Sequence, residues 1–210
     1  MKIRKINFLN LEEKILEEAA DCIRRGGVVV FPTETSYGLA VDPRNSKAVK
    51  KLFRIKGRAA SKTLSLIAAD TKMVTTVATL SATEKKLAQD FWPGALTLIL
   101  TPKKNLPRHV RSAIGVAIRV SGNSFARSLA AAYKFPLTAT SANYSTKPAT
   151  YSLAQFQQQF REHNHQPDLF LNAGRLPKRR ASTLAIIRQG SVTILRPGPI
   201  TLSQLTRVIH

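Results

Sequence analysis

The sequence contains a single cysteine, Cys22, among its 210 residues. One cysteine excludes a disulfide within the chain and excludes zinc sites built from closely spaced cysteine pairs. Cys22 falls near the apolar side of a predicted helix, so we expect a small core residue. This cysteine usage suits a reducing compartment, and we expect a cytoplasmic protein.

Long apolar runs are also missing from the sequence. No segment has the roughly 18 consecutive apolar residues that cross a bilayer, and no apolar core of a signal peptide is present. We therefore expect no membrane partner. At 43% hydrophobic residues, the chain still has enough apolar side chains for a folded core.

Acidic residues are few, because 12 Asp and Glu stand against 33 Lys and Arg, giving a formal net charge of +21. Residues 91–210 contain only Glu162 and Asp168 as acids. Such a field attracts polyanions and anionic small molecules, including RNA and nucleotides. General solubility is the alternative explanation for the excess charge.

The common catalytic and nucleotide-binding motifs are absent, including the phosphate-binding glycine loops and the helical zinc motif with two histidines. Carboxylates are too sparse for a mechanism that uses two acids. We therefore expect no tightly bound, protein-ligated metal. Any metal would be held mainly by substrate phosphates, with help at most from Glu34 or Asp42.

The most informative stretch that is present runs from Val28 to Leu39. Its first four residues are apolar and predict a buried strand, which Pro32 ends because proline has no N–H to donate. Four hydroxyl side chains and one carboxylate follow in residues 33–37. Polar groups at the carboxyl end of a buried strand are typical of ligand sites in open α/β sheets, although a simple polar turn would give the same pattern.

A second predicted strand, residues 136–139, also ends in polar residues, at 140–143. The two strand ends can therefore converge on one ligand. Arg119 interrupts a further apolar strand, which is costly unless the arginine is paired or faces an anion. Strand ends and loops together supply cations, hydroxyls and amides that suit phosphate and carboxylate binding: Thr33, Thr35, Lys56, Arg58, Lys62, Arg119, Ser141, Asn143, Ser182 and Arg196.

Helical and strand patterns alternate along the chain without an internal repeat. Apolar spacing predicts helices after caps at Asn45 or Ser46, at Ser81 and at Ser152, and a helix over 124–133. Further strands are predicted at 64–68, 96–101, 116–120, 168–171, 183–187 and 192–195. The alternation predicts one α/β domain with a twisted, mixed β-sheet flanked by helices.

Six segments, in this order, resemble the YrdC-like family, the L-threonylcarbamoyladenylate synthases. The segments are Phe31–Leu39, Lys56–Arg58, Trp92–Thr97, Gly115–Arg119, Ser141–Asn143 and Leu195–Gly198. The resemblance covers about residues 8–205 and is to the short, single-domain form without a C-terminal extension domain. It implies a YrdC-like fold with a large basic cavity.

The resemblance also implies a reaction. L-threonine, bicarbonate and ATP with Mg²⁺ would give threonylcarbamoyl-AMP and pyrophosphate, and partner proteins would transfer the threonylcarbamoyl group to adenosine 37 of tRNA. No protein nucleophile is needed, so catalysis would rest on positioning and electrostatics, chiefly by Lys56 and Arg58.

The resemblance further assigns sides to the candidate residues. Thr35, Arg119 and Ser182 correspond to the threonine side, and Thr33 to the cavity wall. The ATP side corresponds to Lys56, Arg58, Lys62, Ser141, Asn143 and Arg196. Residues 178–180, Lys-Arg-Arg, depart from the family pattern in a loop that is usually rich in glycine and proline. The alternative function is a protein that binds double-stranded RNA or tRNA in ribosome or rRNA maturation.

Overall fold

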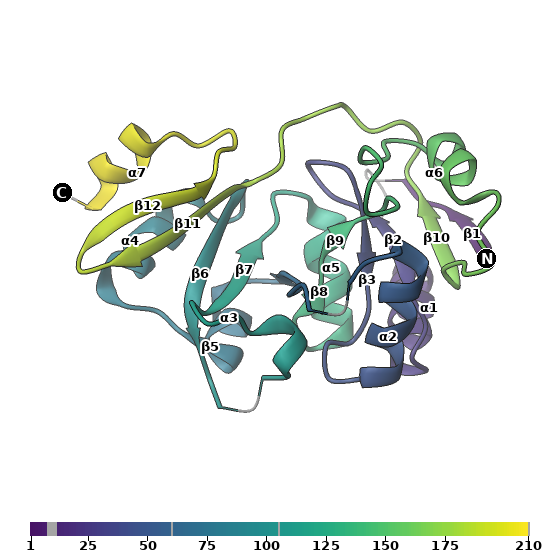
Figure 1. Ribbon diagram of the computed structural model, residues 1–210, viewed down its shortest axis with the longest axis horizontal. Coiled ribbons are helices and arrows are strands. Elements are labelled where there is room, and N and C mark those ends of the chain that lie inside the picture. Colours follow the sequence, from purple (N-terminus) through teal and green to yellow (C-terminus); the bar gives the residue numbers. More distant parts are fainter. Residues whose placement is uncertain (8–11, 60, 105, 210) are drawn as a thin grey trace.

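The computed structural model describes residues 1–7, 12–59, 61–104 and 106–209 of the chain. Its strands form two mixed sheets, which Figure 1 shows in different halves of an elongated molecule. The five-stranded sheet has the order β1 (Lys2–Lys5), β10 (Leu169–Asn172), β2 (Val29–Pro32), β3 (Tyr37–Ala40) and β9 (Thr140–Ser141).

The second sheet contains the longer strands of the C-terminal half. Its order is β12 (Ser191–Arg196), β11 (Thr183–Arg188), β6 (Leu96–Pro102), β7 (Val116–Val120), β4 (Leu66–Ala68) and β8 (Leu137–Thr138), and β5 (Ala78–Thr79) pairs with β6. The α/β class is confirmed. The strands make two hydrogen-bonded sheets where the sequence predicted one. The domain limits, residues 8–205, stay a prediction.

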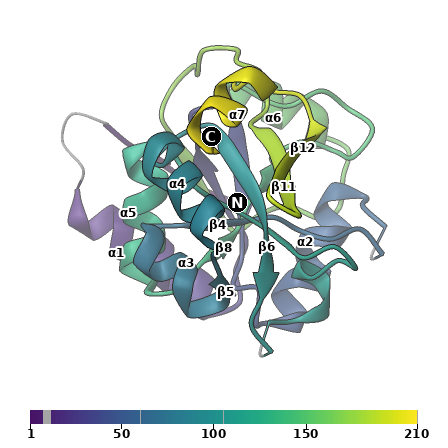
Figure 2. The ribbon, with the colours of Figure 1, turned by 90° about the vertical axis from the view of Figure 1, so that its left-hand side faces the viewer.

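Helices cover the sheets from both sides and pack on them through apolar faces. They are α1 (Glu13–Arg24), α2 (Ser46–Lys56), α3 (Thr71–Val77), α4 (Ala82–Phe91), α5 (Ser124–Tyr133), α6 (Leu153–Phe160) and α7 (Leu202–Ile209). Helix α5 contacts β2 of one sheet and β4 of the other, and α7 packs on α4 and β12 (Figure 2). No helix in the described part of the chain is long and apolar enough to cross a membrane.

The predicted helix caps are present. The Asn45 side chain accepts hydrogen bonds from two backbone N–H groups of α2, and Ser81 and Glu84 form a reciprocal capping box at α4. The Ser152 side chain caps α6 by accepting from one backbone N–H group. These caps satisfy N–H groups that the first helical turn leaves without partners, so local sequence is sufficient to place the helix starts.

The stretch after β2 turns back along the sheet. Pro32 is the last residue of β2, so the strand ends where the sequence predicted, and it lies opposite Tyr37 because β2 and β3 form an antiparallel hairpin. Residues 33–36 are the hairpin loop between β2, which is parallel to β10, and the antiparallel strand β3. The proline is tolerated because it is the last residue of its strand, where its missing N–H costs little.

A short crossing segment, residues 137–141, connects the two sheets. Its first half is β8 of the seven-stranded sheet and its second half is β9 of the five-stranded sheet. The N–H of Thr138 donates to Val41 O at 3.1 Å, and its hydroxyl accepts from Val41 N at 2.9 Å. The two sheets are therefore fixed against one another at the level of β3, β4 and β9.

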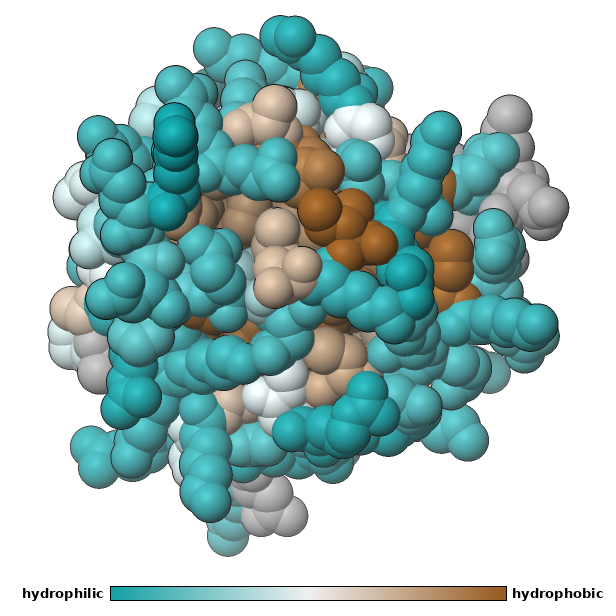
Figure 3. All heavy atoms as spheres, turned by 90° about the vertical axis from the view of Figure 1, so that its right-hand side faces the viewer, coloured by the Kyte–Doolittle hydropathy of each residue, from teal (hydrophilic) through white to brown (hydrophobic). Residues whose placement is uncertain are grey.

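At the end of the molecule that carries β1 and β10, hydrophilic side chains cover most of the surface, with a few apolar ones between them (Figure 3). Edge strand β1 has two lysines and an arginine beside the exposed Ile3. Charged edge strands discourage pairing with another chain. We therefore regard this end as a solvated face.

Candidate functional site

A cavity of about 320 Å³ lies where the hairpin loop, the crossing segment and the C-terminal strands meet. We call it the central cavity. Four arginines and no carboxylate are among its described lining residues, so its charge suits an anionic ligand. From the predicted set it brings together Thr33, Thr35, Arg58, Arg119, Ser141, Ser182 and Arg196.

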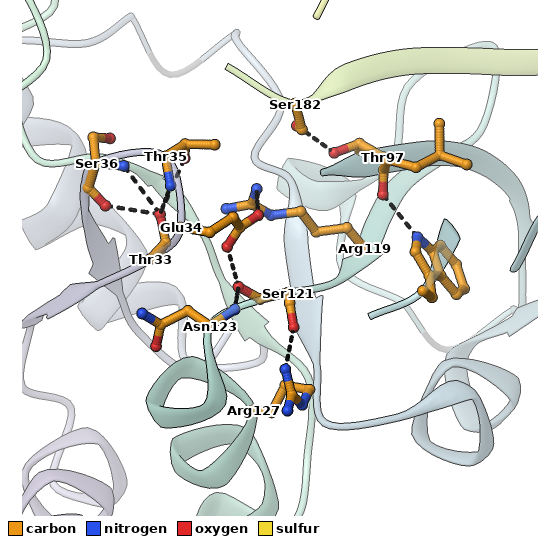
Figure 4. Close-up of polar contacts among 12 residues, drawn as sticks. Thr33, Glu34, Thr35, Ser36, Thr97, Arg119, Ser121, Asn123, Arg127 and Ser182 are labelled. Carbon is orange, nitrogen blue, oxygen red and sulfur yellow. Dashed lines mark hydrogen bonds and ion pairs between the residues drawn. The ribbon is translucent and has the colours of Figure 1, made fainter. Parts of the chain in front are cut away.

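Thr33 holds the hairpin loop in shape. Its hydroxyl donates to Ser36 O at 2.7 Å and accepts from the backbone N–H groups of Thr35 and Ser36 at 3.2 and 3.3 Å. The Thr35 hydroxyl lies 3.0 Å from that of Thr33 and lines the cavity (Figure 4). Thr33 thus acts on the backbone, and Thr35 is the hydroxyl available to a ligand.

Arg119 is the penultimate residue of β7 and is 8% exposed. Its Nη1 lies 2.5 Å from Oε1 of Glu34, whose other oxygen accepts from the Ser121 hydroxyl. Burial lowers the pKa of Arg119, and the Glu34 carboxylate opposes that shift. The arginine is therefore both paired and on the cavity wall, so the two alternatives that the sequence left open are not exclusive.

Ser182 and Arg196 are joined on the opposite wall. The Arg196 guanidinium donates to Ser182 O at 2.9 Å and to Ser182 Oγ at 3.0 Å, and that hydroxyl lies 2.8 Å from the hydroxyl of Thr97. Figure 4 shows the Arg119 guanidinium between this pair of hydroxyls and the hairpin loop. Burial and the nearby Arg119 charge both lower the pKa of Arg196, because the two arginines face the same space.

The contact between Ser182 and Arg196 also explains why the Leu195–Gly198 segment ends in glycine. A side chain on Gly198 would place its Cβ 2.2 Å from the backbone nitrogen of Thr183 and 2.6 Å from Ala181 O. Only glycine allows the segment after β12 to lie this close to the start of β11. The Arg196-Pro197-Gly198 turn therefore holds the arginine against Ser182.

Arg58 follows the left-handed Gly57 at the end of α2. Its Nη2 donates to Thr63 O at 2.9 Å. Its Nε is the one buried side-chain nitrogen or oxygen of the described residues without a hydrogen-bond partner. An unsatisfied buried donor costs free energy. Arg58 also lines the central cavity, so its guanidinium adds positive charge to that wall.

Lys56 lies behind the cavity wall and is 1% exposed. Its ammonium contacts Ser141 O and donates to Asn143 O at 2.8 Å and Asn143 Oδ1 at 3.4 Å. Burial, and to a smaller extent the charge of Arg58, lower the pKa of Lys56 to about 7. Lys56 thus fixes the loop that carries Ser141.

Asn143 and Lys62 do not line the central cavity. The Asn143 amide donates to Tyr144 O and Lys147 O at 2.8 and 2.6 Å, which stabilises its own loop. The segment between α2 and β4, which carries Arg58 and Lys62, is called the basic loop. Lys62 lies on its outer side, in a separate concavity. The resemblance assigned both to the ATP side, and that assignment stays a prediction because neither is among the described residues that line the central cavity.

Several lining residues were not in the predicted set. Thr97 and Arg179 are the most informative, since the first supports Ser182 and the second adds a fourth arginine. Both lay in segments that the sequence singled out, the Trp92–Thr97 motif and the 178–180 cationic loop. Burial of Thr97 could not be seen from sequence, because it depends on the partner strand β11.

The donors around the cavity do not form a metal cage. No group of three or more His, Cys, Asp or Glu side chains lies together among the described residues. Glu34 is engaged by Arg119 and Ser121, and Asp42 by Arg44 and Tyr133. The two carboxylates that the sequence offered as helpers to a metal are thus engaged by protein partners.

Comparisons with known proteins agree with this geometry. The Sua5/YciO/YrdC family model, described as telomere recombination, matches residues 21–198. Threonylcarbamoyl-AMP synthase of Pyrococcus abyssi is 32% identical over 208 residues, which are 96% of this chain and 60% of that protein. Threonylcarbamoyl-AMP synthase of Thiobacillus denitrificans is 34% identical over 173 residues, 81% of this chain and 89% of that protein.

The crystal structure of Pyrococcus abyssi Sua5 complexed with L-threonine has a TM-score of 0.87 and 31% sequence identity to this chain. The match covers 99% of this chain and 60% of that one. This chain therefore spans about 60% of the length of the Pyrococcus protein. The shared part includes every wall of the central cavity.

Proposed function

Because the chain belongs to the Sua5/YciO/YrdC family, we propose that it is a threonylcarbamoyl-AMP synthase. It joins L-threonine, bicarbonate and ATP and releases pyrophosphate, and its product serves N6-threonylcarbamoylation of tRNA. One observation supports the central cavity as the active site. Four arginines and no carboxylate are among the described residues that line it. A triphosphate and an amino-acid carboxylate both need such a charge.

The two substrates take different sides of the central cavity. Arg119, Thr35 and Ser182 hold threonine, with the free nitrogens of the Arg119 guanidinium on the carboxylate. Arg58 and Arg196 neutralise the triphosphate, and their place among the lining residues supports this assignment. Lys56 acts as a positioning residue, because its ammonium contacts the backbone carbonyl oxygens of Ser141 and Asn143.

The reaction needs no protein nucleophile. Bicarbonate loses hydroxide to give CO₂, and the threonine amine forms a C–N bond with the CO₂ carbon while its proton combines with that hydroxide to give water. An oxygen of the resulting carbamate then attacks the α-phosphorus of ATP. The new O–P bond forms as the bond between the α-phosphorus and the bridging oxygen breaks, and pyrophosphate leaves with that electron pair. The arginines stabilise the charge that shifts onto pyrophosphate. Mg²⁺ arrives with ATP and offsets phosphate charge.

Threonine-dependent release of pyrophosphate tests this function. The protein is incubated with ATP, Mg²⁺, bicarbonate and labelled threonine, and both pyrophosphate and the labelled adenylate are measured. We expect both products in equal amounts and neither without threonine. Absence of both products, while ATP still binds, would contradict the proposal.

The charge of the molecule favours a second function, contact with double-stranded RNA or tRNA. Only two acids lie in residues 91–210, so the C-terminal half offers little repulsion to phosphates. Gel-shift titration of a duplex RNA without substrates measures this binding. We expect micromolar binding that weakens as salt is added, and no binding at low salt would contradict it.

A further inference from the structure

A second concavity lies on the outer side of the basic loop that carries Arg58. This outer basic cavity has a volume of about 530 Å³. Among its described lining residues, three are cationic, two carry hydroxyls and none is acidic: Ser61, Lys62, Thr63, Arg108, His109 and Arg111. Its chemistry therefore suits a small, highly charged anion.

The cations are held on a defined backbone. The 3₁₀ helix Arg108–Val110 is tied to the basic loop, since Leu64 N donates to His109 O at 2.8 Å. On its other side the His109 ring contacts Pro43 O through Nε2. Arg108 and Arg111 thus project from a segment that is anchored on two sides.

One residue separates the outer basic cavity from the central cavity. Thr63 lines both, and its carbonyl accepts the hydrogen bond from Arg58 Nη2 at 2.9 Å. An anion that binds Arg58 in the central cavity competes for this guanidinium. Binding of a phosphate to Arg58 would therefore weaken the hydrogen bond that holds Thr63, which forms the wall between the two cavities.

We propose that the outer basic cavity binds pyrophosphate as it leaves the central cavity. The inference rests on the proposed function, because adenylyl transfer produces pyrophosphate beside Arg58. Pyrophosphate carries its charge on two adjacent phosphoryl groups, and Arg108 and Arg111, which both line the cavity, each offer a guanidinium fork that binds a phosphoryl group bidentately. A second cationic site on the other side of Thr63 lowers the free energy needed to move this ion out of the arginine-lined central cavity.

A phosphodiester backbone is a poorer match. Duplex RNA offers single charges spread along a convex surface, whereas these side chains surround a concavity that adjoins the place where pyrophosphate forms. Geometry and position thus both favour the small anion. RNA is the competing occupant in the experiment.

Binding is measured by calorimetric titration of pyrophosphate into protein saturated with α,β-methylene-ATP, which blocks the central cavity. We expect one further equivalent of pyrophosphate to bind, at least tenfold more weakly in the Arg108→Gln/Arg111→Gln variant. Lys85→Gln/Lys86→Gln is the matched control, since it removes the same charge from exposed positions of α4 that line neither cavity. Equal binding by both variants, or no second equivalent in the wild type, would overturn the proposal.

A kinetic arm separates release from chemistry. In Arg108→Gln/Arg111→Gln, single-turnover formation of the adenylate should keep its wild-type rate, while steady-state turnover falls several-fold. An equal fall in both rates would overturn the exit role. Loss of duplex RNA binding with unchanged pyrophosphate binding would instead assign the cavity to RNA.

The binding arm needs no turnover, so it stands apart from the proposed function. A protein that makes no adenylate but shows the variant-sensitive pyrophosphate site loses the enzyme assignment and the exit role, and keeps the anion site. A protein that makes the adenylate but lacks the second equivalent loses the exit site only. Thermal unfolding of each variant verifies that the exposed substitutions leave the fold intact.

Discussion

Arg119 and Lys56 are both buried cations, but they have different partners and therefore different roles. Arg119 pairs with a carboxylate and keeps part of its guanidinium on the cavity wall. Lys56 has only neutral oxygens around its ammonium and no place on that wall. Charge alone does not separate a ligand-binding residue from a positioning residue, whereas the partners do.

Replacing Arg119 with lysine tests its place on the threonine side. Lysine keeps a positive charge for Glu34 but loses the planar fork that grips a carboxylate. We expect the KM for threonine to rise about tenfold, corresponding to roughly 1.4 kcal/mol, with little change in the Kd for ATP. Parallel threonine kinetics and ATP calorimetry measure the two effects, and equal losses would contradict the assignment of sides.

The Lys56 ammonium predicts how stability depends on pH. An unfolded lysine has a pKa of about 10.4, and in the fold the pKa of Lys56 falls to about 7. Between these values the unfolded chain binds more protons than the native one. The stability of the wild type relative to Lys56→Met should therefore rise from about pH 7 toward about pH 10, by at most about 1.4 kcal/mol per pH unit.

Urea unfolding of both proteins at pH 7, 8 and 9 gives this difference directly. Lys56→Met is a suitable reference because methionine has a similar length and no charge. A difference that stays flat over this range would mean that the oxygens of Ser141 and Asn143 keep the ammonium fully charged. In that case the lysine would anchor its loop equally well at every pH.

At the scale of elements, the turn after α2 shows why its glycine cannot be replaced. Gly57 has φ = 56°, and a Cβ there would lie 2.2 Å from the Tyr144 ring. The turn brings together the end of α2, the basic loop and the 141–147 loop. A side chain at residue 57 would push apart the elements that position Lys56 and Arg58.

Gly57→Ala should therefore destabilise the protein and weaken ATP binding. Gly190→Ala is its control, because Gly190 also has a positive φ (77°) but has no neighbouring atom within 4 Å of where its methyl group would lie. Backbone strain alone costs both variants about 1 kcal/mol. We expect Gly57→Ala to lose at least about 1 kcal/mol more in urea unfolding, since the ring must also move. Equal losses would show that the Tyr144 contact is unimportant.

Elements with local signals could be predicted from sequence, and those with distant partners could not. Caps and apolar spacing placed α2, α4, α5 and α6, and apolar runs placed β6 and β7. Strand β3 was missed because its residues follow a loop rich in hydroxyls and its pairing with β2 and β9 is tertiary. Strand β1, four mostly charged residues, has no strand pattern of its own and forms because β10 lies beside it.

The candidate site divides in the same way. Seven predicted residues meet at the central cavity, because motif residues at strand and loop ends converge there. Sequence could not show that Lys56 and Asn143 are used internally, since their acceptors are backbone oxygens brought close by folding. Nor could it show that Thr63 lines both cavities whereas its neighbour Lys62 lines only the outer one, because this depends on the path of the loop backbone.

The charge of the whole molecule acts on one substrate and not on the other. A net charge of +21 on 210 residues creates a long-range positive potential. ATP carries several negative charges, whereas threonine is a zwitterion without net charge at neutral pH. Added salt screens the potential beyond a Debye length of about 10 Å at roughly 0.1 M, so only ATP should respond strongly.

We therefore expect the Kd for ATP to rise several-fold between roughly 50 and 500 mM KCl, because the screening length falls from about 14 to about 4 Å. The Kd for threonine should change less than twofold, because the proposed contact between its carboxylate and the buried Arg119 acts at short range. Calorimetry with each ligand alone measures both values. Similar salt dependence for the two would mean that local contacts, and not the field of the whole molecule, draw the nucleotide to the cavity.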